Sequence, residues 1–287
     1  MSISKFLLTA ILAASAVVPA SAQTETERKE KEVVWTEMDG VRIPLPPKEH
    51  PRLYLREGDI PALNEKIKTP EGKAILKRLR KAAKPRTAEE EAKVKDHGFR
   101  YYAQMRGVTS QSQLDALAYL TEGDPHIADR AITAMLDTLK KTNFGTKNDL
   151  SRASGSMLMV GAMVYDWCYD RMSEGQKREY IREFVRIAGT MECHYPPKNT
   201  ECVAGHGSEW MILRDMLSCG IAIYDEYPEM YEIVAKMIFR DYVPVRNYIY
   251  AGHNYHQGTG YVTVRYLNDL NSLWIFDRMG AGEIYSP

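Results

Sequence analysis

The chain has 287 residues and carries 38 basic and 38 acidic side chains, so its formal net charge at pH 7 is zero. This balance argues against a dedicated nucleic-acid-binding protein, which usually has an excess of Lys and Arg. It leaves room for an anionic substrate held by a few arginines, and the length suits one large domain or two modest ones.

The N-terminal segment has the features of a secretory signal peptide. Lys5 precedes the apolar run FLLTAILAASAVV, which is too short to span a membrane comfortably. Ala20, Ser21 and Ala22 form a small-residue cleavage site. We therefore expect residues 1–22 to be removed, which predicts a periplasmic or secreted protein with no membrane span in its mature form. The alternative is an uncleaved membrane anchor.

Residues 23–44 are predicted to be a linker and an extended lead-in, and residues 45–287 a single helical domain. The stretch TETERKEKE is charged and lacks apolar residues, and IPLPPKEHPRLYL is rich in proline, which disfavours regular structure. Beyond it, apolar residues recur at helical spacing. Helices are predicted at 57–68, 70–84, 88–106, 112–122, 125–142, 150–171, 173–191, 207–225, 228–240 and 261–279.

Two of these helix starts carry recognisable capping residues. Asp124 is followed by Pro125, and Ser173 is followed three residues later by Gln176, which is a capping box. Helices of ~10–20 residues joined by short loops favour stacked antiparallel hairpins, and no fixed-period repeat is visible. We therefore predict an all-α fold, an incomplete α/α toroid, in which loops at one end of the helix pairs line a groove.

The four cysteines leave the disulfide pattern open, because they allow three full pairings. Cys193 and Cys202 flank HYPPKNTE and could close that loop in an oxidising compartment, but their spacing fits no zinc site. Cys168 and Cys219 lie in apolar helical patterns and are predicted to be buried free thiols.

The stretch AGHGSEWMILRDM places an ionisable pair, His206 and Glu209, just before an apolar helical run. At a spacing of three residues the two share a helix face, and Gly205 and Gly207 let a ligand approach the backbone. The positive end of the helix dipole favours a neutral imidazole, and partial burial would raise the pKa of the glutamate. The alternative is a histidine that caps the helix and a glutamate bonded to local backbone.

A second polar stretch, AGHNYHQGTGYVTVRY, gathers several reactive side chains at a turn and helix start. They are His253, His256, Gln257, Tyr261 and Arg265. Tyr261 and Arg265 are four residues apart and share a helix face. A phenol normally has a pKa of about 10, and a nearby guanidinium favours the tyrosinate and lowers that value.

Together these side chains meet the requirements of β-elimination from a uronate. The proton next to a uronate carboxylate is weakly acidic. Its removal needs the carboxylate neutralised, a base at C5 and an acid at the leaving O4. Glu209 as a protonated donor fits the first role. His206 or Tyr261 fits the second, and Tyr261 the third.

A third polar stretch, NDLSRASGS, places Arg152 near a helix start. There its guanidinium could bind a carboxylate or a sulfate through two hydrogen bonds. The alternative is a surface arginine beside Asp149.

Four stretches resemble the helical N-terminal domain of the heparinase II/III-type polysaccharide lyases, and most closely the heparinase II group. They are HPRLYLREGDIPALNEKI, MVYDWCYDRMSEGQKREYI, GHGSEW and YHQGTGYVTVRY. Their order and approximate spacing agree along nearly the whole mature chain. The first two are similar to the family's scaffold, and the last two to the segments that carry its chemistry.

The resemblance implies a polysaccharide lyase that degrades heparin- or heparan-sulfate-like glycosaminoglycans. His206 then matches the catalytic histidine, Glu209 the glutamate that neutralises the uronate, and Tyr261 the catalytic tyrosine. The family's substrate-holding residues are matched by Arg152, Arg265, His256 and Gln257.

Members of this family continue past the helical domain into β-sandwich-like domains. Those domains supply a further active-site histidine and, in the heparinase II group, a structural zinc site. The present sequence ends at GEIYSP without such a region. The resemblance therefore implies a toroid truncated at its C-terminal end, with no metal or other cofactor held by this chain. The implied partner is an acidic polysaccharide, and a homodimer is among the assemblies left open.

Two other functions remain open. A glycoside hydrolase on an α/α scaffold needs two catalytic carboxylates that face each other across a cleft. Asp149, Glu201 and Glu209 are candidates, but none has an evident partner, and Tyr261 would be idle. A lyase-derived fragment without activity would bind the glycan and release no unsaturated product.

Overall fold

Helices make up nearly all of the regular structure in the computed structural model, which describes residues 33–84, 87, 89, 97–144, 148–198, 208–253, 255 and 258–285. The signal-like segment 1–22 lies outside these residues. The longer helices are α2 (Ile60–Lys68), α3 (Pro70–Ala83), α5 (His97–Glu122), α6 (Pro125–Lys141), α7 (Asn148–Trp167), α8 (Glu174–Gly189), α11 (Pro228–Met237), α12 (Val243–Ala251) and α13 (Gly258–Arg278). Shorter elements are η2 (Glu57–Asp59), η3 (Tyr169–Arg171), α9 (Ser208–Trp210), η4 (Met211–Met216), α10 (Leu217–Ala222) and η5 (Ile238–Tyr242).

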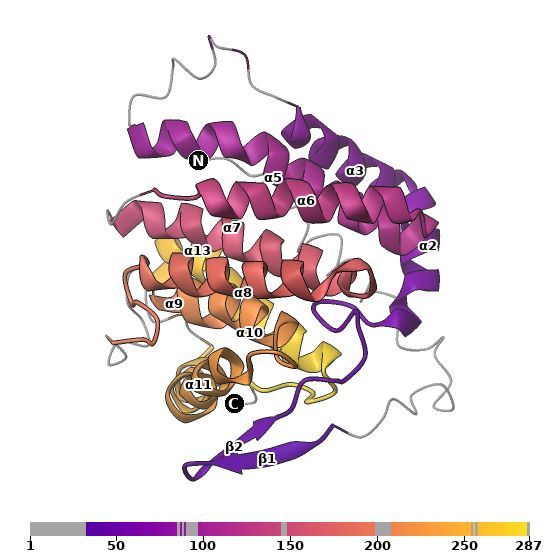
Figure 1. Ribbon diagram of the computed structural model, residues 1–287. Coiled ribbons are helices and arrows are strands. Elements are labelled where there is room, and N and C mark those ends of the chain that lie inside the picture. Colours follow the sequence, from indigo (N-terminus) through magenta and orange to yellow (C-terminus); the bar gives the residue numbers. More distant parts are fainter. Residues whose placement is uncertain are drawn as a thin grey trace.

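The helices stack against one another in a layered body (Figure 1). α5 packs on α3, α6 and α7, α8 covers α6 and α7, and α10 contacts both α7 and α11. Ile132 of α6, Leu158 of α7 and Phe184 of α8 are fully buried at these contacts, and each such side chain contributes about 1.5–3 kcal/mol. The described part of the chain is therefore all-α apart from one short hairpin, which confirms the predicted class.

The helix starts predicted from capping residues are confirmed. The Asp124 side chain accepts a hydrogen bond from the main-chain N–H of His126 at 2.9 Å. Ser173 and Gln176 form the reciprocal capping box, in which each side chain accepts from the other residue's main-chain N–H. Local hydrogen-bonding chemistry thus fixes where α6 and α8 begin.

The two helices predicted at 88–106 and 112–122 form one helix, α5, in the described chain from His97 onward. Gly107 lies within it and costs only about 1 kcal/mol relative to alanine. The Thr109 hydroxyl donates to the carbonyl of Met105 and so stays inside the helix. Packing against α3, α6 and α7 outweighs these weak breaking signals.

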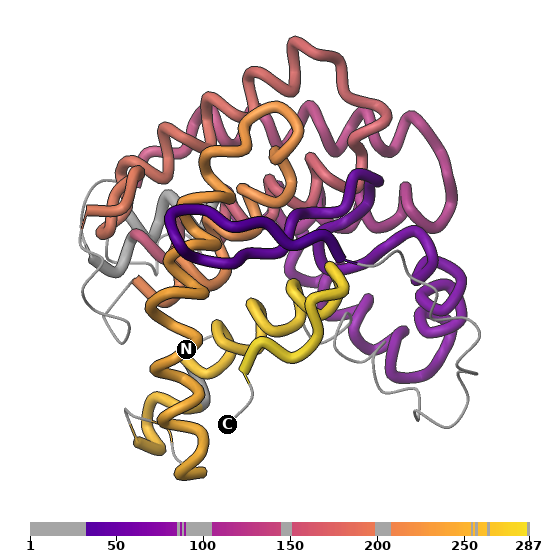
Figure 2. Tube along the Cα trace, turned by 90° about the horizontal axis from the view of Figure 1, so that it is seen from below, coloured from indigo at the N-terminus to yellow at the C-terminus, as the bar shows by residue number. Residues whose placement is uncertain are grey.

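Residues 35–44, predicted as part of an extended lead-in, instead form an antiparallel hairpin of β1 (Trp35–Met38) and β2 (Val41–Pro44). Asp39 and Gly40 at its tip have φ angles of 52° and 76°, the left-handed pair that a tight two-residue hairpin turn requires. Figure 2 shows the hairpin crossing one side of the molecule next to α11. The Tyr231 hydroxyl of α11 donates to the carbonyl of Pro44.

Two helices contain π-helical segments that the sequence pattern did not predict. The helix expected at 228–240 continues through η5 and α12 to Ala251. Pro244 lies two residues after the end of η5, and its ring crowds the carbonyl of Arg240 four residues earlier, so a wider turn at this point relieves the clash. The segment η4 interrupts the helix expected at 207–225 directly after Trp210, and such bulges are frequent at functional sites.

Residues 45–56 connect the hairpin to the helices and are anchored by the buried carboxylate of Asp166 in α7. This carboxylate accepts from the main-chain N–H groups of Arg52 and Leu53, both at 2.9 Å, and lies 2.6 Å from Nδ1 of His50. The buried guanidinium of Arg52 donates to the carbonyls of Pro47, Ile221 and Ala222. Hydrogen bonds to buried polar groups therefore help to hold the extended segment, together with the burial of Leu53 and Leu55.

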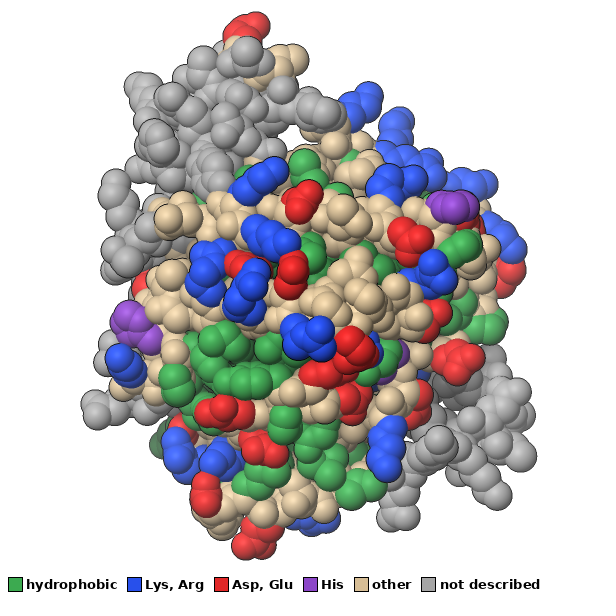
Figure 3. Space-filling view, in the orientation of Figure 1, with side chains coloured by type: hydrophobic (Ala, Val, Ile, Leu, Met, Phe, Trp, Pro, Cys, Tyr) green, Lys and Arg blue, Asp and Glu red, His purple; other side chains and the backbone are tan. Residues whose placement is uncertain are grey.

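Acidic and basic side chains are interspersed over the face shown in Figure 3, as the balanced composition leads one to expect. Among the residues described, no helix combines the length and the apolar character needed to cross a lipid bilayer.

Candidate functional site

Glu209 and Arg265, two of the residues predicted from separate stretches, lie close together in the structure. Glu209 belongs to the short helix α9 and is fully buried, and Arg265 belongs to α13 and is 6% exposed. Nη1 of Arg265 lies 3.7 Å from Oε2 of Glu209. The fold thus brings the two polar stretches to one place.

Tyr261 lies one turn before Arg265 on α13 and is 51% exposed. The Arg265 guanidinium carbon lies 4.5 Å from the centre of the Tyr261 ring, a cation–π contact. Arg265 therefore touches both the buried carboxyl of Glu209 and the exposed phenol. Arg265 thus lies between the buried Glu209 carboxyl and the solvent-exposed Tyr261 ring.

Arg246 and Asp269 complete the buried cluster and were not among the predicted residues. Nη2 of Arg246 in α12 donates to Oε1 of Glu209 at 2.7 Å, and its Nε donates to Oδ1 of Asp269 in α13 at 3.0 Å. The hydroxyl of Tyr250 donates to the other oxygen of Asp269 at 2.6 Å. The sequence signal was a charged residue within the apolar helical stretch VPVRNYIY, because a charge buried there needs a partner.

Burial raises the pKa of Glu209 to about 7, because a carboxylate loses its hydration in this interior. Arg246 and Arg265 oppose the rise, and the charge of Asp269 adds to it. Burial likewise raises the pKa of Asp269, against the opposing hydrogen bonds from Tyr250 and Arg246. A substantial fraction of Glu209 is therefore protonated near neutral pH, where it can donate a hydrogen bond.

Arg152 of α7 lies beside the residue that follows Glu209. Its guanidinium carbon is 5.8 Å from the ring centre of Trp210, and that of Arg214 is 4.7 Å from the same ring. Arg214 also donates to the buried carboxylate of Asp215 at 2.6 Å. The third predicted stretch thus approaches the same part of the molecule through Trp210.

Three of the predicted site residues, His206, His256 and Gln257, lie outside the described residues. His253, from the same stretch as His256, is exposed and has a φ angle of 50°. Cys168 and Cys219 are buried free thiols, as predicted. Cys193 is also a buried free thiol, 3.5 Å from the sulfur of Met211, and Cys202 lies outside the described residues.

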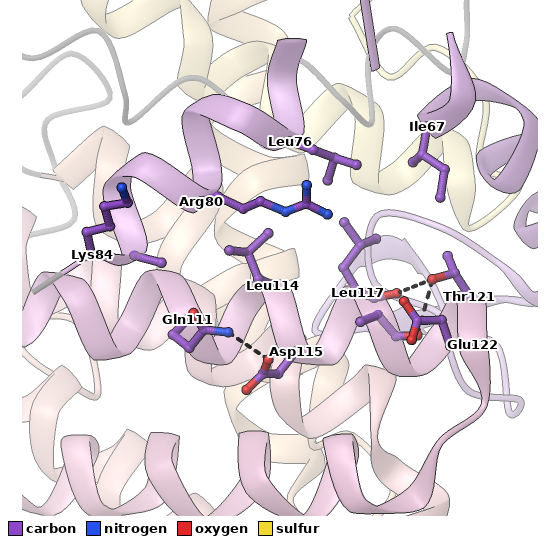
Figure 4. Close-up of a pocket in the computed structure, with 12 residues that line it drawn as sticks. Ile67, Leu76, Arg80, Lys84, Gln111, Leu114, Asp115, Leu117, Thr121 and Glu122 are labelled. Carbon is purple, nitrogen blue, oxygen red and sulfur yellow. Dashed lines mark hydrogen bonds between the residues drawn. The ribbon is translucent and has the colours of Figure 1, made fainter. Parts of the chain in front are cut away.

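A cavity of about 500 Å³ opens between α3 and α5, away from this cluster (Figure 4). Leu76, Leu114 and Leu117 line it together with polar side chains that include Arg80 and Asp115. Two hydrogen bonds from Arg130 at 2.8 and 2.9 Å already engage the Asp115 carboxylate. None of the predicted site residues lines this cavity, so its size alone does not make it the candidate site.

The described part of the chain contains no group of three or more His, Cys, Asp or Glu side chains arranged to hold a metal ion.

Replacing Glu209 with Gln should change the way stability depends on pH. The Glu209 carboxyl has a pKa of about 7 in the folded protein and an ordinary value of 4.5, so between these values the folded protein binds more protons than the unfolded chain. The stabilising contribution is complete below pH 4.5. It is lost as the pH rises through about 7, with a slope of up to about 1.4 kcal/mol per pH unit.

Urea unfolding across this pH range measures the difference between the two proteins. The free energy of unfolding should fall less steeply in Glu209→Gln, because the amide does not titrate. Equal slopes in the two proteins would contradict the raised pKa.

Neither models of known protein families nor the sequences of curated proteins match this chain.

Proposed function

We propose that this protein is a polysaccharide lyase that cleaves a uronic-acid-containing glycosaminoglycan, of the heparin or heparan sulfate kind, by β-elimination. The observation that carries the proposal is the contact of Arg265 with both the buried Glu209 carboxyl, at 3.7 Å, and the exposed Tyr261 ring, at 4.5 Å. As part of the same proposal, the stacked helices belong to an incomplete α/α toroid. The signal-like N-terminus supports an exported enzyme, which meets such polymers outside the cytoplasm.

The reaction needs the negative charge of the substrate carboxylate to be neutralised before its neighbouring proton can leave. A protonated Glu209 donates a hydrogen bond to that carboxylate, and Arg265 adds positive charge. Oε1 of Glu209 is held by Arg246. Oε2 lies 3.7 Å from Arg265, which also contacts the exposed Tyr261 ring, so in this proposal the substrate carboxylate approaches Glu209 from the Arg265 side.

Tyr261 performs the proton transfers in this proposal, because its ring is the exposed member of the group. As a phenolate it removes the C5 proton, and as a phenol it returns a proton to the leaving O4. His206 is the other candidate for the C5 base. The electron pair of the broken C–H bond forms the C4–C5 double bond, and the C4–O4 bond breaks.

The buried cluster favours a lyase over a glycoside hydrolase. A hydrolase needs two carboxyl groups separated by about 5–10 Å on either side of a sugar, both within reach of it. In the described part of the chain, Glu209 and Asp269 are both tied to the same guanidinium of Arg246 inside the protein. They are therefore poorly placed to act on opposite faces of one glycosidic bond. The Glu201 residue and the Asp149 side chain lie outside the described part.

An ultraviolet absorbance assay tests the proposal, because β-elimination creates an unsaturated uronate that absorbs and hydrolysis does not. The protein expressed from its complete gene is incubated with heparin, heparan sulfate, hyaluronan and alginate. We expect absorbance to grow with at least heparin or heparan sulfate. New reducing ends without absorbance would indicate a hydrolase, and binding without either product an inactive glycan-binding protein. Both results would overturn the proposal.

A further inference from the structure

Arg246 is the residue around which the buried charged cluster is built. It is fully buried, and its Nε and Nη2 donate to Asp269 and Glu209 at 3.0 and 2.7 Å. Its guanidinium carbon also lies 5.6 Å from the ring centre of Tyr242. A single guanidinium thus connects the carboxyl of the candidate site to a second carboxyl on another helix.

The two carboxyls around Arg246 are held differently. Asp269 receives one hydrogen bond on each oxygen, from Arg246 and from Tyr250, and such bonds favour its charged form. Oε1 of Glu209 receives the bond from Arg246, and Oε2 faces Arg265 at 3.7 Å. Asp269 is thus tied to Tyr250 as well as to Arg246, and its carboxyl offsets the charge of Arg246 beside Glu209.

We infer that Arg246 is a positioning residue, which holds the Glu209 carboxyl in place and, balanced by Asp269, controls whether that carboxyl carries a proton. Its consequence for catalysis rests on the proposed function. Arg246 touches no substrate in this scheme, because it is fully buried behind Glu209.

The groups that face Glu209 come from several elements. Among the residues that the structure describes, they include Arg246 of α12, Arg265 and Asp269 of α13, Tyr242 of η5 and Tyr255 of the segment before α13. The two arginines favour the carboxylate, and Asp269 favours the protonated acid. Burial raises the pKa of both tyrosine hydroxyls, so they stay neutral where Glu209 titrates.

Two substitutions should move the titration of Glu209 in opposite directions. Arg246→Met removes a positive neighbour and should raise the titration midpoint by about one pH unit or more, and Asp269→Asn removes a negative neighbour and should lower it by a similar amount. A purely structural role would loosen the site without giving opposite signs. The titration is followed by NMR with ¹³C-labelled glutamate carboxyls, and the signal missing in Glu209→Gln identifies Glu209.

Two further variants complete the design. Arg246→Lys keeps the positive charge but replaces the planar guanidinium, which donates to both Glu209 and Asp269, with a single ammonium group. The Glu209 midpoint should therefore move much less than in Arg246→Met, while turnover falls because Glu209 is no longer held rigidly. Arg240→Met is the matched control, because Arg240 is an exposed arginine paired with Asp241, and it should change neither. Where Arg246→Met does not fold, Asp269→Asn and Arg246→Lys still decide the result.

The inference and the proposed function can fail separately. The role of Arg246 is refuted if the titration midpoint of Glu209 is unchanged in Arg246→Met and Asp269→Asn, or if it moves in the same direction in both. If it moves as expected but no glycan yields an unsaturated product, the positioning role stands and the lyase proposal fails. If product forms, kcat/KM should decline at alkaline pH with a midpoint that follows the NMR midpoint of Glu209 in each variant. A decline at the same pH in every variant overturns the catalytic consequence of the inference.

Discussion

Replacing Tyr261 with Phe should lower the rate of uronate β-elimination about 10²- to 10⁴-fold, the usual size of a lost proton-transfer group. The change removes only the hydroxyl and keeps the ring against the Arg265 guanidinium, 4.5 Å away. Because the Tyr261 side chain is 51% exposed, its hydroxyl contributes about 1 kcal/mol or less to stability. The loss should therefore appear in kcat without a matching loss of folded protein.

Substrate binding should survive in Tyr261→Phe, because Arg152 and Arg265 are unchanged. Turnover is measured by the absorbance of the unsaturated product, and binding by titration with an oligosaccharide. Glu209→Gln should be milder than Tyr261→Phe, since the amide still donates a hydrogen bond to the substrate carboxylate.

Tyr248→Phe is the matched control for Tyr261→Phe, because Tyr248 is also an exposed tyrosine, at 85%, on the neighbouring helix α12. It should leave turnover unchanged. A Tyr261→Phe protein that folds and cleaves at the wild-type rate would show that Tyr261 is an ordinary surface tyrosine and would remove the acid and base from the proposed mechanism.

Local chemistry explains which parts of the fold could be predicted from the sequence. The starts of α6 and α8 follow from Asp124 and from the Ser173–Gln176 box, because capping depends only on residues a few positions apart. The hairpin was also encoded locally, in Asp39-Gly40 between apolar residues, but the surrounding prolines and charges favoured an extended segment. Gly107 lies in the gap between the helices predicted at 88–106 and 112–122, because glycine lowers the local preference for helix. The packing of α5 that outweighs this preference involves residues far away in the sequence.

The candidate site shows a similar division between local and long-range information. Glu209, Tyr261 and Arg265 are conspicuous in short stretches that contain glycine and polar residues, so the sequence alone points to them. Arg246 and Asp269 lie in stretches that look like ordinary helix. Their pairing depends on how α12 and α13 are placed beside α9, which no spacing within either stretch determines. A single sequence therefore indicates the side chains in the glycine-bearing stretches better than the partners in regular helix that hold them.

Replacing Asp166 with Ala should lower the free energy of unfolding by about 3–5 kcal/mol, the cost of removing one partner from a buried charged group. The carboxylate accepts from the main-chain N–H groups of Arg52 and Leu53 and contacts His50 at 2.6 Å. Alanine leaves both buried N–H groups without an acceptor, at about 1–3 kcal/mol each. Segment 45–56 would thereby lose three polar contacts with α7.

The exposed Asp129, paired with Arg171 at 3.2 Å on the surface, provides the matched control for Asp166. Asp129→Ala should cost less than about 1 kcal/mol, because water screens an exposed pair. Urea unfolding of the two variants and the wild type measures both losses in the free energy of unfolding, provided that this free energy falls with urea concentration at the same slope in all three proteins. Equal small losses would show that the segment is held by its apolar contacts. A large loss confined to Asp166→Ala would show that one buried carboxylate joins the N-terminal segment to the helices.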